Sequence, residues 1–217
     1  MPEEDSSSQN VNLRIDAVDS YRASGDGFKI KLSDGSFFYV SYAFYREARL
    51  GCGIDVDEEL LVRLENESQR QLCRQKAFDF LSLREHSVFE LSQKLKHKRF
   101  STGIVRSVLS ELTEKGVVDD ERFAQLYIES HVRRGKESRT EMAAKLAGKG
   151  VASETVRSLI NRLYDVETEE KIAAALVQKA AGSGKSTDKV KESLLRKGFP
   201  FRVVKALFPA SADDKEE

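Results

Sequence analysis

Two hydrophobic periods divide the chain. Near the N-terminus, apolar and polar residues alternate with a period of two, in the segments 11–17 and 28–32. An Asp-Gly dipeptide at 34–35 follows and is succeeded by the aromatic run 37–40, which is a strong signal for a hairpin. The pattern predicts a small antiparallel sheet of about three strands, followed by a short helix around residues 43–50.

From about Asp57 the period changes to 3.6 residues, which is typical of amphipathic helices, and helical patterns continue to Phe208. Ser87 and Ser138 each stand three residues before a Glu, which predicts two capping boxes. Either Asp119 or Asp120 can cap the helix that carries Phe123. Glycines stand where helices are expected to end, at residues 116, 135, 150 and 198.

The most informative feature is an internal repeat, because segments 90–112, 141–163 and 190–208 align with one another. Each aligned segment follows another helical stretch, so the sequence predicts three tandem units of three helices. Such units must stack on their neighbours to bury enough apolar area, which predicts an elongated, curved body. The matching apolar positions are Leu95, Leu146 and Leu194; Phe100, Val151 and Phe199; Val105, Val156 and Val204; and Leu109, Ile160 and Phe208.

We therefore expect a mainly α fold, with three tandem three-helix repeats preceded by a small antiparallel β segment. The expected parts are a disordered leader (1–10), the β segment with its short helix (11–56), a linking helix with the first repeat (57–118), the second repeat (119–166), the third repeat (167–208) and an acidic tail (209–217).

Composition narrows the class of protein. The 217 residues include 36 Lys and Arg and 36 Asp and Glu, so a uniformly basic coat is excluded. Any anion-binding surface must arise from local segregation of charge. No apolar stretch approaches the ~18–20 residues of a membrane span. The polar, acidic N-terminus and the two cysteines, Cys52 and Cys73, favour a cytoplasmic protein with reduced thiols.

No motif in the sequence combines the residues that a catalytic site needs. The segment Gly182–Thr187 resembles a phosphate-binding loop, but its first glycine would have to be residue 179, which is Lys. We interpret it as a helix–helix linker in which Ser186 or Thr187 caps the next helix. The three histidines lack metal-ligand spacing, and Cys73 fits a small buried apolar position. We expect no enzyme, no cofactor and no metal site.

Charge segregation is the remaining signal. The segments 94–99, 131–149 and 185–205 carry net charges of +4, +4 and +5, while residues 55–67 and the last residues are acidic. This pattern fits either solvated helix faces, with lysines favoured in last turns, or a surface for an anionic partner.

Three motifs resemble the RecX family, whose members regulate the RecA recombinase. The central one is Asp119-Asp120-Glu-Arg122-Phe123-Ala with Tyr127, then Arg133-Arg134-Gly-Lys136 and KLAGKGV. The upstream segment 81–100 resembles the family's first repeat, and LLRKGF at 194–199 resembles its third. The resemblance covers roughly residues 70–208. One departure is Arg99, where the other repeats have Gly150 and Gly198.

The resemblance implies a non-catalytic protein of DNA repair, homologous recombination and the SOS response. Such a protein would lodge in the RecA–DNA filament groove and inhibit ATP hydrolysis, filament growth and strand exchange. The alternative is a general nucleic-acid-binding helical module without a protein partner. We expect a monomer that meets the RecA filament and single- or double-stranded DNA without sequence specificity, and that does not bind membranes.

Two ladders of basic residues recur at equivalent repeat positions, namely Lys98, Lys149 and Lys197, and Arg106, Arg157 and Lys205. The candidate filament- and DNA-binding residues are Lys94, Lys98, Arg106, Arg133, Arg134, Lys136, Arg139, Lys145, Lys149, Arg157, Lys197 and Lys205. The motif residues Asp119, Asp120, Arg122, Phe123 and Tyr127 are expected to be structural, and Phe123, Leu126 and Tyr127 form a helical stripe in which Phe123 anchors the core.

Overall fold

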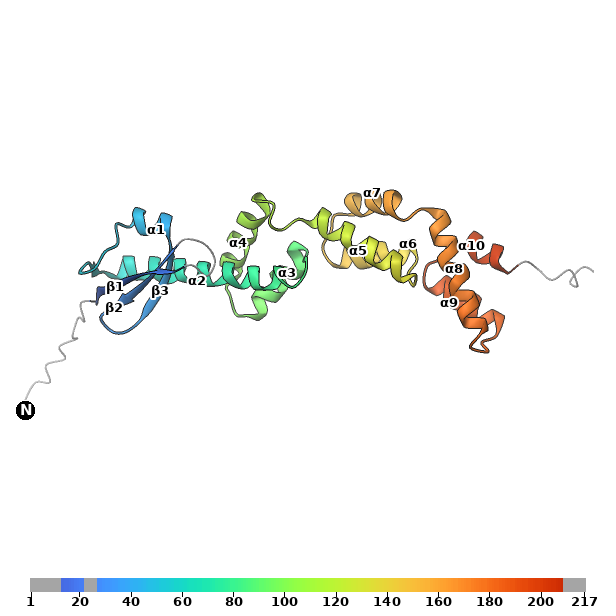
Figure 1. The fold of residues 1–217 in the computed structure, drawn as a ribbon, viewed down its shortest axis with the longest axis horizontal. Coiled ribbons are helices and arrows are strands. Elements are labelled where there is room, and N and C mark those ends of the chain that lie inside the picture. The colour runs from blue at the N-terminus through green and yellow to red at the C-terminus, as the bar shows by residue number, and fades with distance from the viewer. Residues whose placement is uncertain (1–12, 22–26, 209–217) are drawn as a thin grey trace, which may run out of the picture. The chain divides into compact units, whose positions relative to one another are not determined.

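The computed structural model describes residues 13–21 and 27–208, which form ten helices and four strands (Figure 1). The described residues divide into two compact units. One unit comprises residues 13–84 and 91–114, and the other comprises 85–90 and 115–208. The predictions made for Val11, the leader 1–10 and the acidic tail 209–217 lie outside the described residues. A mainly α fold with a small antiparallel β segment is confirmed.

The sheet of the first unit has four strands, one more than the sequence predicted. They are β1 (Leu13–Tyr21), β2 (Gly27–Leu32), β3 (Phe37–Ser41) and β4 (Asp55–Val56), in the order β3-β2-β1-β4 with antiparallel pairing. The extra strand β4 pairs with the start of β1 over only two residues, which is too short to leave an alternating pattern. The Asp-Gly turn forms as expected, with Gly35 at φ 86°.

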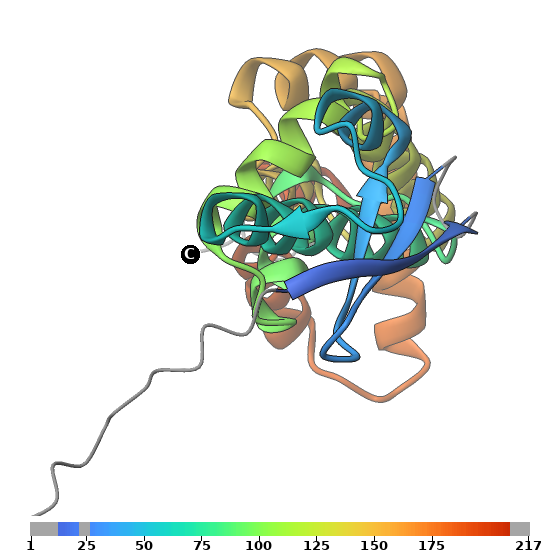
Figure 2. The same ribbon diagram turned by 90° about the vertical axis from the view of Figure 1, so that its left-hand side faces the viewer.

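Two helices cover this sheet. The short helix α1 (Tyr42–Glu47) ends earlier than expected, because the chain turns at Arg49 with φ 49°. The helix α2 (Glu58–Leu81) starts at the N-cap Asp57 and lies along the edge strand β3. Ser68 Oγ on α2 accepts a hydrogen bond from the backbone N–H of Tyr39, at 3.1 Å. Figure 2 shows the strands to one side of α2. Ile30, Leu32 and Val40 of the strands and Leu64 of α2 belong to one core cluster.

The second part of α2 belongs to the first three-helix repeat, with α3 (Val88–His97) and α4 (Thr102–Glu114). Arg70 and Arg74 on α2 form ion pairs with Glu111 on α4, at 3.0 and 3.4 Å. Cys73 is fully buried, as predicted, and burial raises the pKa of its thiol to about 11.

The second unit contains two more triplets of helices. They are α5 (Asp120–Arg134), α6 (Arg139–Gly148) and α7 (Ser153–Leu163), then α8 (Val166–Ala181), α9 (Thr187–Arg196) and α10 (Phe201–Leu207). One core runs through both triplets and includes the aligned positions Leu146 and Leu194, and Val156 and Val204. Phe123 belongs to this core and is 4% exposed. No helix in the described part of the chain is long and apolar enough to cross a membrane.

Candidate functional site

The second unit contains the same junction between helices twice. Ser87 Oγ accepts a hydrogen bond from the N–H of Glu90, at 3.1 Å, and donates one to the carbonyl of Lys149, at 2.7 Å. Ser138 Oγ does the same with the N–H of Glu141, at 3.0 Å, and with the carbonyl of Lys197, at 2.6 Å. Each serine therefore caps its own helix and holds the end of the corresponding helix in the next repeat.

An acidic residue completes each junction from the next repeat. Asp120 Oδ1 accepts a hydrogen bond from the N–H of Val88, and Glu169 Oε1 accepts one from the N–H of Arg139, both at 2.8 Å. The sequence left open whether Asp119 or Asp120 is a cap. Asp119 caps its own helix, and Asp120 caps the helix of the preceding repeat.

A glycine lies at the closest approach in each junction. Gly150 has φ +81°, and a Cβ atom built on it would lie 2.5 Å from the Cβ of Phe89. Gly198 has φ +82°, and its Cβ would lie 3.0 Å from the Cβ of Thr140. No side chain fits at the first of these positions without displacing the neighbouring helix.

Arg122 fixes the loop that leads into α5. Its guanidinium donates to Glu85 at 2.9 Å and to the carbonyls of Gly116 and Val117 at 3.1 and 2.9 Å. The hydrogen bond that Arg122 donates to the Glu85 carboxylate is the main cause of a raised pKa for Arg122. These contacts tie the loop at residues 116–117 to Glu85 through one side chain.

Tyr127 lies beside the first junction. Its ring stacks on the ring of His131, with centroids 3.8 Å apart, and the Nζ of Lys149 lies 5.6 Å from its centroid. Burial raises the pKa of the Tyr127 hydroxyl. These contacts give Tyr127 a packing role next to the repeat boundary.

Three candidate binding cations have partners inside the protein. Lys149 forms an ion pair with Glu90. Lys145 forms ion pairs with Glu137 and Glu141, at 2.8 and 2.9 Å, and both carboxylates raise the pKa of its ammonium group. The Nζ of Lys94 lies 4.9 Å from the centroid of the Phe80 ring. Glu90 lies 59 residues from Lys149, so no local pattern shows that pair, whereas Glu141 lies four residues before Lys145 on the same helix.

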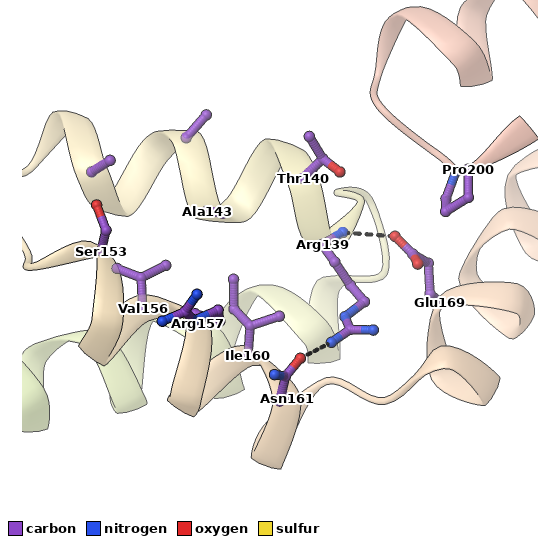
Figure 3. Close-up of a pocket in the computed structure, with 12 residues that line it drawn as sticks. Arg139, Thr140, Ala143, Ser153, Val156, Arg157, Ile160, Asn161, Glu169 and Pro200 are labelled. Atoms are coloured by element: carbon purple, nitrogen blue, oxygen red, sulfur yellow. Dashed lines mark hydrogen bonds between the residues drawn. The ribbon is translucent and has the colours of Figure 1, made fainter.

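Arg139 and Arg157 line one hollow of about 560 Å³, with an apolar wall of Ala143, Val156 and Ile160 (Figure 3). The Arg139 guanidinium donates to Asn161, and its backbone N–H donates to Glu169. Arg139 therefore spans from α7 to α8, and only Arg157 presents an exposed cation here.

A second hollow, of about 610 Å³, contains the candidate residues Lys136 and Lys197. Four further cations line it, namely Lys179, Lys185, Lys189 and Arg196. The site prediction omitted these four residues, although the net charge of the segment 185–205 was a signal for three of them. The segment at 182–186 joins α8 to α9, and Ser186 stands at the N-cap without a side-chain cap bond.

The other candidate cations are exposed: Lys98, Arg106, Arg133, Arg134 and Lys205. Over the described ranges, no group of three or more His, Cys, Asp or Glu side chains could hold a metal ion.

Comparison with known proteins identifies the class. The family model "RecX, first three-helix domain" matches residues 73–112, and "RecX, second three-helix domain" matches residues 119–159. The first model starts inside α2. Both matched segments are therefore three-helix repeats of a RecX-type protein.

The chain is similar in sequence to proteins named "Regulatory protein RecX" over most of its length. The protein of Halorhodospira halophila is 32% identical over 152 residues, which cover 67% of this chain and 92% of the relative. That of Amycolatopsis mediterranei is 33% identical over 141 residues, covering 62% and 79%. The chain belongs to the RecX family. It spans 65% of the length of the relative from Halalkalibacterium halodurans, which is 28% identical over 173 residues covering 76% of this chain.

Two solved structures share the fold. A structure described as "Crystal structure of regulatory protein RecX" superposes with a TM-score of 0.74 at 20% identity, covering 90% of this chain and 98% of that one. RecX from Lactobacillus salivarius gives a TM-score of 0.57 at 19% identity, covering 64% and 94%.

Proposed function

We propose that this chain is a non-enzymatic regulator that lodges in the groove of the RecA–DNA filament and lowers ATP hydrolysis, filament growth and strand exchange. The observation that carries the proposal is the tandem of RecX three-helix domains. The relatives to which the chain is similar are named "Regulatory protein RecX".

The side chains proposed to meet the filament are Arg106, Arg157 and Lys205. Each is the fifth residue of the third helix in its repeat, and each is exposed. Within the described residues, none of the three forms an ion pair, so their charges are available to a partner. Lys205 lies in the last turn of the short α10, where the helix dipole favours a cation. Arg106 and Arg157 lack that benefit. The helix dipole therefore does not account for these two cations, which favours a role in binding the filament.

The test is charge reversal of all three residues to Glu. Filament binding by the variant, and its inhibition of RecA ATP hydrolysis on single-stranded DNA, should fall by more than about tenfold, because opposite charges become like charges. The control reverses one other exposed cation per repeat, in Lys96→Glu/Arg162→Glu/Arg202→Glu. Equal inhibition by the ladder variant and the parent would exclude these residues as the contact.

Binding to bare DNA and to the filament at one salt concentration separates this function from the alternative of a general nucleic-acid-binding module. We expect tighter binding to the filament, and no ATP hydrolysis by the chain alone. Equal affinities would favour the module, because binding to phosphates alone does not distinguish the two targets.

A further inference from the structure

The hollow lined by α8, α9 and Lys136 gathers six cations around one cavity. We infer that this hollow, here called the basic hollow, binds the phosphate backbone of single-stranded nucleic acid. The inference deepens the proposed function, because it names the part of the chain that would contact the DNA of the filament.

Six cations line the basic hollow from separate segments: Lys136 before α6, Lys179 near the end of α8, Lys185 in the following loop, and Lys189, Arg196 and Lys197 on or next to α9. The other lining residues are Leu176, Ala180, Ser183, Val190, Ser193 and Leu194. No carboxylate is among them. Lys189, Arg196 and Lys197 are seven and eight residues apart along α9, so they share one helix face.

Among the described residues, none of the six cations of the basic hollow forms an ion pair, in contrast to three other lysines of this unit. Lys145, Lys149 and Lys171 each contact a carboxylate within 4 Å. Inside the basic hollow, the Nζ of Lys197 donates at 3.5 Å to the backbone carbonyl of Lys136. Gathering six like charges without compensation costs stability, and an anionic ligand would offset that cost.

Helix dipoles account for only part of the arrangement. Cations are favoured in the last turn of a helix, which covers Lys179 and Arg196. Lys185 and Lys189 lie at the opposite end of α9, where the dipole disfavours a cation. Their convergence with the last-turn residues on one hollow therefore points to a ligand.

The chemistry of the wall defines that ligand. Ammonium and guanidinium groups donate to phosphate oxygens, whereas the aliphatic lining offers no aromatic ring on which a base could stack. A flexible single strand can follow a concave surface with successive phosphates, and a stiff duplex cannot bend into it. Binding should therefore depend on salt and be indifferent to the bases.

The experiment measures anisotropy of a labelled oligo(dT) of about 30 nucleotides with the full chain over a range of salt concentrations. The variant Lys185→Gln/Lys189→Gln/Arg196→Gln should bind at least about tenfold more weakly than the parent. The slope of log K against log salt should become shallower by about 2, because three phosphate contacts are lost. The matched control, Lys171→Gln/Lys191→Gln/Arg202→Gln, removes the same charge from the same repeat and should change the affinity by less than about threefold.

Equal weakening in the two variants would overturn the inference, because net charge rather than a site would then explain binding. A parent that fails to bind oligo(dT), or that prefers a duplex, would also overturn it. Thermal unfolding of both variants at the parent temperature shows that folding is intact. Inhibition of RecA by the parent is measured in parallel. If the parent binds oligo(dT) through the basic hollow but does not inhibit RecA, the proposed function alone is contradicted. If the parent inhibits RecA but the hollow variant binds oligo(dT) as tightly as the parent, this inference alone is contradicted.

Discussion

In each repeat, the second helix ends in a turn with a left-handed residue. The residue type at this position differs between the first repeat and the later two, whereas the backbone conformation is the same. Arg99 has φ 68°, and the equivalent residues Gly150 and Gly198 have φ 81° and 82°. At both glycines a Cβ atom would press against a side chain of the preceding repeat. Arg99 is exposed, and its repeat is preceded by the β segment rather than by another three-helix repeat.

This difference separates two reasons for a glycine. A left-handed residue costs about 1–2 kcal/mol, and the first repeat tolerates that cost with an arginine. Close packing between repeats is the added requirement at residues 150 and 198. The sequence difference at 99 is therefore explained by the absence of a junction at that turn.

The largest expected effect comes from Gly150→Ala. The new methyl group would add left-handed strain to a 2.5 Å approach to Phe89. The expected loss in free energy of unfolding is about 3 kcal/mol, which denaturant titration would measure. The control Arg99→Ala keeps the same backbone without a packed neighbour and should change stability by less than about 0.5 kcal/mol. Similar losses at both positions would mean that the backbone conformation alone determines the residue.

The serines offer a second comparison, because Ser87, Ser138 and Ser186 occupy the same repeat position. Ser138 is fully buried and bonds both Glu141 and Lys197, whereas Ser186 is exposed and makes no side-chain cap bond. Ser138→Ala should therefore cost about 2 kcal/mol of unfolding free energy, because a cap is lost and the Lys197 carbonyl loses its donor. Ser186→Ala should cost less than about 0.5 kcal/mol. A cost at Ser186 equal to that at Ser138 would contradict the role assigned to the junction.

Local signals explain how much of this fold could be predicted. The change of period, the capping serines and the glycine stops act within a few residues, and the repeat alignment located core leucines such as Leu146. The strand β4 was missed because two residues carry no period. The second bond of Ser87 and Ser138, to the next repeat, depends on tertiary packing that no local pattern encodes.

The candidate cations were harder to predict for the same reason. Sequence position showed that Lys145 and Lys149 recur in a basic segment, but not that Glu137 and Glu90 lie beside them. The basic hollow gathers Lys136, Lys179 and Lys185 from three segments. Charge counts along the chain register such residues without showing that they share a cavity.

The smallest expected effect tests the acidic partner in the first junction. Asp120 accepts a hydrogen bond from the Val88 N–H, and an Asn side-chain oxygen could accept the same bond. Burial raises the pKa of the Asp120 carboxyl, the Val88 N–H opposes this rise, and the charge of Asp119 adds to it. The folded protein thus holds the proton more tightly than the unfolded chain, so the parent loses stability as pH rises from about 4 through the raised pKa.

Asp120→Asn removes that titration. The free energy of unfolding of the variant minus that of the parent should therefore increase as pH rises from about 4 through the raised pKa of Asp120, and then stay level. Denaturant titrations at several pH values would measure it, with Asp120→Ala as a control that loses the acceptor and is destabilised at every pH. A difference that decreases as pH rises would mean that the charge of Asp120 stabilises the junction, and that its hydrogen bond to Val88 outweighs the cost of burial.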